Sequence, residues 1–310
     1  MNKMEIKNNV LRKLVENRLG DLNAQKLLGT SGTQSQSDNT QLSQFDMDIL
    51  KRGLCRRVST IISEQQNWED VVHRTDVILQ DEDNNSYPQD VNHVETDQGW
   101  IDDCMEGASK TYNDDLKQYF AKLLAGEIKN PGRYSKRAIQ FLRSISQNDA
   151  VKIRNMCQYV MYSYSHDDAI ILRYKKSEYS YNETSFLMEL RLIDSSSFVV
   201  KQYRSQEDNN QGFFIHGNVG FFMNIKKKEY DLPIYSFTEL GKEILSIIDN
   251  VDVNLDYLKN FSKSITEGKK DIEIVGGEFF MEGETLHFCK NEKYFEVPEK
   301  INSNDSAAAK

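Results

Sequence analysis

The amino-acid sequence predicts a mainly α fold with a C-terminal α+β part, in which a helical bundle precedes a winged-helix-like module with short antiparallel strands. Apolar residues recur every three or four positions through most of the first half of the chain. The chain has only four prolines, which suits long helices. After about residue 164 the pattern changes to short segments typical of strands, separated by turns that contain Gly and Asn.

The composition limits the class of protein. The chain has 310 residues, which suits two modest domains, and 38% of them are hydrophobic, which is enough to build cores. The net charge of −9 argues against a whole-surface nucleic-acid binder, because phosphate contacts require basic side chains. No apolar run approaches the roughly 20 residues of a membrane helix, and the charged N-terminus does not resemble a signal peptide. We therefore expect a cytoplasmic protein with no membrane span.

The chain divides into consecutive regions where its composition and periodicity change. The clearest change is a low-complexity stretch of Ser, Thr, Gln, Asn and Gly, which is typical of a flexible linker. The expected regions are N-terminal amphipathic helices (1–28), a flexible linker (29–44), a helical bundle (45–163), a winged-helix-like α+β module (164–250), a small C-terminal α+β subdomain (251–300) and a disordered tail (301–310).

The first region carries an apolar stripe at helical spacing, formed by Ile6, Val10, Leu11, Leu14 and Val15. One short amphipathic helix is marginally stable in water, so this stripe must be covered. It packs on the body of the protein, associates with another copy of the chain, or lies on a membrane surface. Charges of both signs on the polar face weaken the membrane alternative.

A long helix is predicted from about residue 47 to residue 72, with apolar residues three or four positions apart. Arg52, Arg56 and Arg57 lie largely off its apolar stripe, and Arg52 and Arg56 are one helical turn apart. These arginines form either an ordinary solvated face or a basic strip that docks an acidic partner or a nucleic-acid backbone.

Three or four helices follow between Trp100 and Tyr162. Asn113 is a favourable N-cap for a helix over 114–128, and acidic residues in its first turn suit the helix dipole. The sequence Asn-Pro-Gly at 130–132 ends that helix, and Ser135 begins the next.

The C-terminal part is predicted to mix helices and strands. Lys226, Lys227 and Lys228 follow a predicted hairpin whose turn is His216-Gly217-Asn218, and they occupy the position of a wing. A basic wing would reach phosphates, whereas lysines at a hairpin more commonly protect a sheet edge. The predicted helices are 183–193, 238–248 and 255–265, and the predicted strands are 197–203, 212–215, 219–225, 234–237, 271–275, 279–282 and 285–289, with Gly276-Gly277 and Gly283 in turns.

Catalytic patterns are absent from the sequence. It contains no HExxH, phosphate-loop, GxGxxG or nucleophile-elbow motif, and its four cysteines form no CxxC pair. His166-Asp167-Asp168 is the one cluster of histidine with acids, and it is more typical of a solvated loop than of a metal site. Asp271 and Glu273, beside Lys269 and Lys270, are the closest approach to a nuclease site. We assign no catalytic residue, metal or cofactor.

Residues 100–150, with the core LLAGEIKNPG at 123–132, resemble the bacterial DUF2806 family, and EQQNWEDVV at 64–72 resembles the helix that precedes that core. Phe120 stands where the family would have Trp. The family implies no activity, so no catalytic role is transferred. Glu127 lies near a helix C-terminus, where an acid is disfavoured, and we expect it to pair with Arg133 or Arg137 or to bind a partner. The structural motif residues are Trp100, Leu124, Gly126, Glu127, Pro131 and Gly132.

Two further stretches, FLMELRLID at 186–194 and YSFTELGKEIL at 235–245, are similar to the end of the Abi-alpha (DUF4393) abortive-infection proteins. This resemblance implies bacterial defence against phage. Our leading hypothesis is therefore a non-enzymatic sensor or adaptor in abortive infection, which binds a protein partner or associates with itself through its N-terminal helices. The alternatives are a nucleic-acid-binding regulator that uses the winged-helix-like module, and a cryptic metal-dependent nuclease or hydrolase.

Overall fold

The computed structural model describes most of the chain between residues 44 and 290. The predicted N-terminal helices, the predicted linker up to residue 43, the predicted C-terminal tail and His166-Asp167 of the candidate metal cluster lie outside the described residues. The described residues are 44–83, 96–163, 168–174, 177, 179–196, 199–207, 209–248, 251–282 and 285–290.

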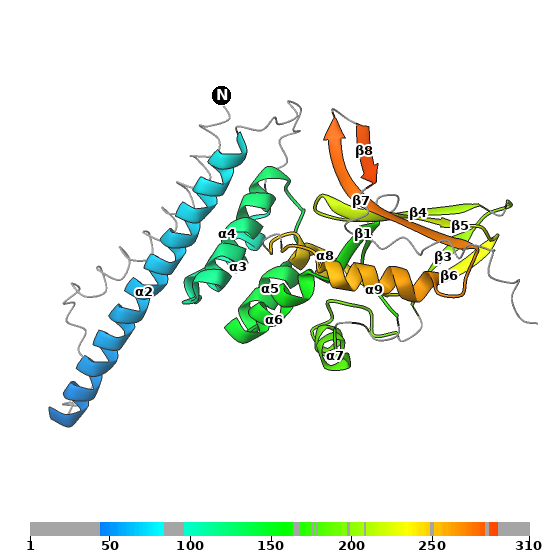
Figure 1. Cartoon of the computed structure of the whole chain (residues 1–310). Helices are drawn as coiled ribbons and strands as arrows, with labels where there is room; N and C mark the ends of the chain where they lie inside the picture. Colours follow the sequence, from blue (N-terminus) through cyan, green and yellow to red (C-terminus); the bar gives the residue numbers. More distant parts are fainter. Residues whose placement is uncertain are drawn as a thin grey trace, which may run out of the picture. The chain divides into compact units, whose positions relative to one another are not determined.

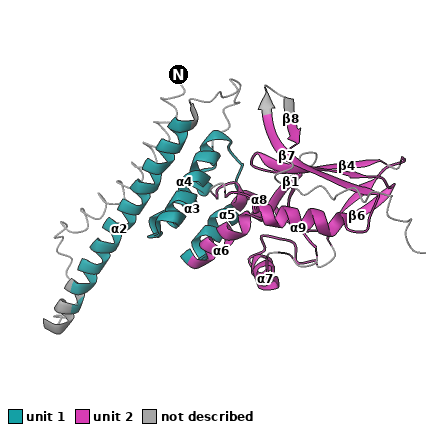
Figure 2. Cartoon of the chain, in the orientation of Figure 1, with its two compact units in different colours: residues 1–147 teal, residues 148–310 magenta. Residues whose placement is uncertain are grey.

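The structure separates into two compact units, residues 1–147 and residues 148–310 (Figure 2). The first unit is helical (Figure 1). Its long helix packs against the two helices that follow it. Among its described residues, the helices of this unit are α2 (Gln44–Asp83), α3 (Gln98–Ser109), α4 (Asp114–Lys129) and α5 (Lys136–Ser144).

Local signals in the sequence fix the ends of these helices. The Asn113 side chain accepts a hydrogen bond from the Leu116 backbone N–H at 3.0 Å, which caps α4 as expected. After α4, Gly132 adopts a left-handed backbone with φ of 85°, a conformation that glycine adopts without strain. The helix over 114–128 and its cap are therefore confirmed, and α5 begins directly after Ser135.

The second unit holds one sheet covered by helices. Within the described residues, eight strands pair in the order β3-β6-β2-β1-β4-β5-β7-β8, and every neighbouring pair is antiparallel. The elements are α6 (Gln147–Cys157), β1 (Val160–Ser163), β2 (Asp168–Leu172), α7 (Tyr181–Glu189), β3 (Val200–Arg204), β4 (Asn210–His216), β5 (Val219–Ile225), β6 (Glu229–Ser236), α8 (Glu239–Leu245), α9 (Leu255–Thr266), β7 (Ile272–Glu282) and β8 (Thr285–Lys290).

Helix α9 lies against the sheet (Figure 1). The hydroxyl of Tyr257 accepts a hydrogen bond from the Leu172 backbone N–H of β2 at 2.7 Å, and the rings of Phe221 and Phe261 lie 5.5 Å apart. The first of these contacts joins residues 85 positions apart in the sequence, and the second joins residues 40 positions apart. The core of this unit therefore sits between α9 and the sheet.

The predicted fold class is wrong. The protein is α+β with an eight-stranded antiparallel sheet among its described residues, and it is not a mainly α protein with a small winged-helix-like module. The strands β1 and β2 are too short and too continuously apolar for alternation to reveal them. Gly276 and Gly277 were predicted in a turn, but they lie inside β7, where Gly277 lets the backbone of Cys289 approach.

Candidate functional site

The motif at the end of α4 forms a closed structural unit. The buried carboxylate of Glu127 accepts hydrogen bonds from the backbone N–H groups of Gly132 at 2.6 Å and Tyr134 at 3.0 Å. The sequence led us to expect Arg133 or Arg137 as its partner. The backbone amides replace an arginine because the Asn-Pro-Gly turn brings them back over the end of the helix.

The other motif residues support the same turn. The indole N–H of Trp100 donates to the backbone carbonyl of Tyr134 at 2.9 Å. A Cβ atom on Gly126 would lie 2.6 Å from the Tyr134 ring, so only glycine lets that ring pack here. Leu124 is buried beside them on α4, and Pro131 precedes Gly132 in the turn. This arrangement accounts for the motif through packing and needs no ligand.

The two stretches at 186–194 and 235–245 lie against each other in the second unit. Ile193 pairs with Phe237, and the Thr238 hydroxyl donates to the Arg191 carbonyl at 2.7 Å. The same hydroxyl caps α8 by accepting from the Gly241 N–H at 3.0 Å. Gly241 also lets the Leu192 carbonyl approach the first turn of α8. Like the α4 motif, this pattern is explained by backbone contacts.

The structure brings two separate sequence candidates together. Lys226 lies 4.0 Å from Glu273, and Lys227 pairs with Asp271. The lysines that follow β5 and the acids at the start of β7 therefore lie side by side at one end of these paired strands and partly neutralise one another. Lys228 is exposed in the same turn, between β5 and β6.

The three candidate arginines of the long helix are exposed. Arg52, Arg56 and Arg57 all lie in the N-terminal half of α2, and their side chains face solvent. Because an α-helix turns by about 100° per residue, Arg52 and Arg56 share one face and Arg57 lies on another. The three arginines therefore do not form one strip.

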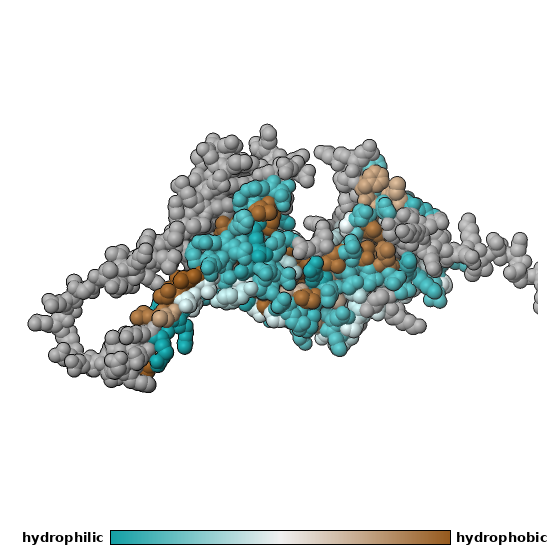
Figure 3. All heavy atoms as spheres, turned by 60° about the vertical axis from the view of Figure 1, so that its left-hand side comes forward, coloured by the Kyte–Doolittle hydropathy of each residue, from teal (hydrophilic) through white to brown (hydrophobic). Residues whose placement is uncertain are grey.

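The same half of α2 exposes large apolar side chains. Leu54, Val58 and Ile62 are 55%, 54% and 51% exposed, and they recur every four residues on one face. Ile61, which widens this stripe, is half-buried. We call Leu54, Val58, Ile61 and Ile62 the α2 seam. Figure 3 shows apolar atoms, in brown, along this stretch of the helix.

The C-terminal half of α2 is covered by its neighbours. Trp68, Thr75 and Leu79 are almost completely buried. Around them, charged pairs join α2 to α4. Lys117 lies 3.0 Å from Asp70, and Arg74 lies 2.8 Å from Asp114. An apolar face with complementary charges beside it is therefore how this helix binds another helix within the unit. The sequence showed the apolar period but not which half would be covered.

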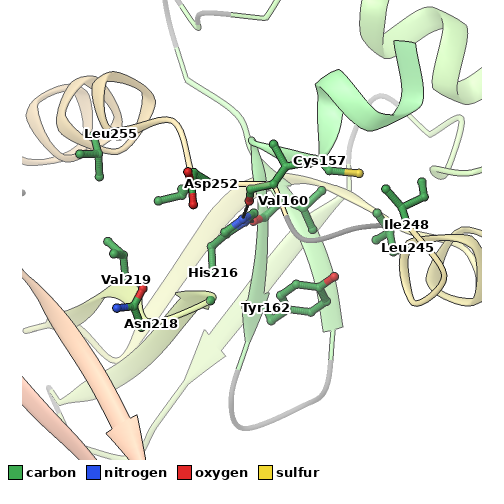
Figure 4. Close-up of a pocket in the computed structure, with 13 residues that line it drawn as sticks. Cys157, Val160, Tyr162, His216, Asn218, Val219, Leu245, Ile248, Asp252 and Leu255 are labelled. Carbon is green, nitrogen blue, oxygen red and sulfur yellow. Dashed lines mark hydrogen bonds between the residues drawn. The ribbon is translucent and has the colours of Figure 1, made fainter. Parts of the chain in front are cut away.

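One pocket of about 520 Å³ opens in the second unit, beside the β4–β5 hairpin (Figure 4). His216, in that hairpin, is held between two backbone carbonyls. Its Nδ1 lies 2.6 Å from the Val160 oxygen, and its Nε2 contacts the Val251 oxygen. A carbonyl oxygen only accepts, so both contacts are hydrogen bonds when both ring nitrogens carry protons. The sequence placed His216 in a turn and gave no signal for these partners.

The pocket offers no pair of a nucleophile and a base. Burial raises the pKa of the Cys157 thiol to about 12, so that it stays protonated near neutral pH. His216 is engaged with backbone, and Asp252 is exposed at the edge of the pocket. Much of the lining is aliphatic, including Leu245 and Ile248. The pocket therefore shows packing and a polar rim, with no side chains arranged for bond-making.

The remaining candidates for chemistry are isolated from one another. In the described part of the chain, no three side chains of His, Cys, Asp or Glu gather closely enough to hold a metal ion. Asp168 pairs with Lys201 at 3.2 Å. Burial raises the pKa of the Cys104 thiol in the first unit. Among the described helices, none combines the length and the hydropathy of a membrane span.

Comparison with known proteins agrees with one of the two resemblances. The family described as "Protein of unknown function (DUF2806)" matches residues 51–262, more than half of the chain. No curated protein and no solved structure matches the chain. The similarity to the Abi-alpha proteins is not found. The matched range includes both the α4 motif and the α2 seam.

Proposed function

We propose that the protein, which belongs to the DUF2806 family, is a non-enzymatic interaction protein, a sensor or adaptor that binds another protein through the α2 seam. The observation that carries the proposal is the exposure of Leu54, Val58 and Ile62, each more than half exposed on a helix whose other half is packed. Exposed apolar residues that form one continuous stripe are typical of interaction sites.

The energetics favour covering this stripe. Burying a Val, Leu or Ile side chain completely stabilises by about 1.5–3 kcal/mol. Since these three side chains are already about half-buried, a partner would gain roughly half of that for each, or about 3 kcal/mol in all. Such a gain is useful in a complex but is smaller than the cost of ordering two molecules. Further contacts beside the seam must therefore contribute to binding.

The test compares two variants of the full chain in its host. One replaces Leu54, Val58 and Ile62 with Gln, and the control replaces Arg56 and Thr60 on the opposite face with Gln. We expect a partner protein to co-purify with the wild type and with the control but not with the seam variant. The purified partner should then bind the wild type and the control with similar affinity and the seam variant more weakly. A seam variant that keeps every partner of the wild type would contradict the proposal.

A role in antiphage defence is the second part of the proposal. Its support is the resemblance of residues 186–194 and 235–245 to abortive-infection proteins, which the comparisons with known proteins did not find. In the structure these two stretches contact each other. Deleting the gene should raise the plating efficiency of some phages, and the seam variant should fail to restore protection. If the seam variant restores full protection against phage, the α2 seam is not required for defence.

A nucleic-acid-binding regulator remains the second candidate, because Arg52 and Arg56 lie one turn apart on an exposed face of α2. It predicts binding that weakens steeply with salt and is lost in Arg52→Glu/Arg56→Glu. Duplex and single-stranded probes in an electrophoretic mobility assay would test it. If this variant binds nucleic acid as tightly as the wild type, Arg52 and Arg56 do not contact the nucleic acid.

A further inference from the structure

Within the span of the α2 seam, from Leu54 to Ile62, the charged residues are all basic, and Glu64 follows soon after the seam. Between Ile49 and Ser63 every charged residue is basic, although the whole chain carries a net charge of −9. An acidic protein has therefore concentrated positive charge on the stretch of helix that exposes its apolar side chains. The basic residues of this stretch are Lys51, Arg52, Arg56 and Arg57.

Arg57 is the arginine that a partner on the seam would meet. It follows Leu54 by three positions and precedes Ile61 by four, so it lies on the same side of the helix as both. Arg56 precedes Val58 by two positions and therefore points about 160° away from it. Both arginines are exposed. The two residues have the same charge and adjacent positions, but only Arg57 flanks the seam.

The buried half of α2 shows how the helix pairs with a neighbour. There the apolar face is accompanied by Asp70 opposite Lys117 and by Arg74 opposite Asp114, so that each of these two charges of α2 meets an opposite charge on α4. If the exposed half binds a helix in the same manner, the group opposite Arg57 must be acidic. A partner with basic flanks would place like charges side by side.

This requirement argues against two occupants from the chain itself. A second copy aligned on the same stretch would bring its basic residues against those of the first. In residues 1–28 basic residues also outnumber acidic ones, so that segment would meet the same repulsion. Its basic residues are Lys3, Lys7, Arg12, Lys13, Arg18 and Lys26, and its acidic residues are Glu5, Glu16 and Asp21.

We infer that the α2 seam binds an amphipathic helix of a different protein, whose apolar face is flanked by Asp or Glu that pair with Arg57. The inference rests on the proposed function and names the chemistry of the partner. A nucleic-acid backbone would satisfy the arginines but would leave Leu54, Val58 and Ile62 in water, whereas an acidic amphipathic helix satisfies both kinds of side chain.

The experiment uses the full chain and two synthetic helical peptides of equal length. Both carry the same Leu and Ile face, and one has Glu at the flanking positions where the other has Lys. Fluorescence anisotropy at low salt should show the Glu peptide binding about fivefold or more tightly than the Lys peptide. In Arg57→Glu this preference should reverse. The matched control, Arg56→Glu, changes the net charge equally and should keep the preference of the wild type.

The outcomes separate the inference from the proposed function. Equal affinity for the two peptides, or a reversal in Arg56→Glu as strong as in Arg57→Glu, overturns the acidic partner while leaving apolar docking intact. Failure of both peptides to bind, or equal binding by the Leu54→Gln/Val58→Gln/Ile62→Gln variant, overturns the docking face itself. Binding of anionic phosphatidylglycerol vesicles in place of the peptides would assign the face to a membrane and also overturn the inference.

Discussion

The two halves of α2 share a helical apolar period but lie in opposite environments. From Gln65 to Leu79 the apolar face is buried against α3 and α4, and the Asn67 side-chain amide of α2 donates to the Ser109 backbone carbonyl of α3 at 3.0 Å. From Leu54 to Ile62 the same kind of face is about half exposed. Helical periodicity thus marks which side of a helix binds something, but not whether the binding element belongs to the same chain.

The first prediction tests whether the buried half belongs to the core. Trp68 is completely buried, and Trp68→Ala should lower the free energy of unfolding by about 3–5 kcal/mol, because a large cavity replaces the indole. Urea denaturation followed by circular dichroism would measure the change. Trp68→Phe should cost less, since the indole N–H has no partner to lose. If Trp68→Ala lowers the free energy of unfolding by less than about 1 kcal/mol, the C-terminal half of α2 is not part of the core, and the proposed contrast between the two halves fails.

The sequence predicted the first unit better than the second for a physical reason. Helix α4 is set by contacts within a few residues, such as the Asn113 cap, and local contacts can be read from a sequence. Strands β1 and β2 depend on partners far along the chain, since β1 pairs with β4 and β2 pairs with β6. Such pairing leaves no local signal, which is why the sheet was underestimated.

The candidate site was likewise predicted only where its features depend on nearby residues. The basic residues and the apolar stripe of α2 were visible in the sequence, whereas the exposure of Leu54 depends on where α3 and α4 end their contact with α2. The pairing of Lys227 with Asp271 joins β5 to β7 across 44 positions and could not be anticipated. The hydrogen-bond donors to Glu127 were missed because they are backbone N–H groups, which every residue type except proline carries.

The second prediction concerns the polar contacts that accompany burial. The Thr75 hydroxyl lies 2.8 Å from the Val71 carbonyl and 3.3 Å from the Ala121 carbonyl of α4. Thr75→Val keeps the shape but removes the hydroxyl, so it should cost about 1 kcal/mol of stability. Thr75→Ser, which keeps the hydroxyl and loses a methyl group, is the control for packing. A Val variant as stable as the wild type would show that the Thr75 hydroxyl adds nothing to the packing of the two helices.

The third prediction uses pH to probe the charged pairs of the buried half. Hydrogen bonds from Arg74, and then from Lys117, lower the pKa of Asp70 below its ordinary value. A lowered pKa in the folded state stabilises the protein above the unfolded pKa of about 4, and this stabilisation is lost as pH falls through the folded value. Because the pair is partly exposed, we expect about 0.5 kcal/mol at most.

The difference in unfolding free energy between the wild type and Asp70→Asn should therefore be constant from about pH 6 to pH 8 and should shrink as the pH falls below about 4. A double-mutant cycle with Lys117→Met would isolate the pair. If the difference in unfolding free energy between the wild type and Asp70→Asn stays the same at low pH, the charge of Asp70 does not contribute to stability.

The smallest change in stability is expected in the exposed half. Leu54→Gln and Val58→Gln should each alter the free energy of unfolding by no more than about 0.5 kcal/mol, because little apolar surface is lost from the folded chain. The same substitutions should weaken partner binding most. A loss of more than about 1 kcal/mol in either variant would mean that the protein itself covers this face, and the α2 seam would then be core rather than a docking site.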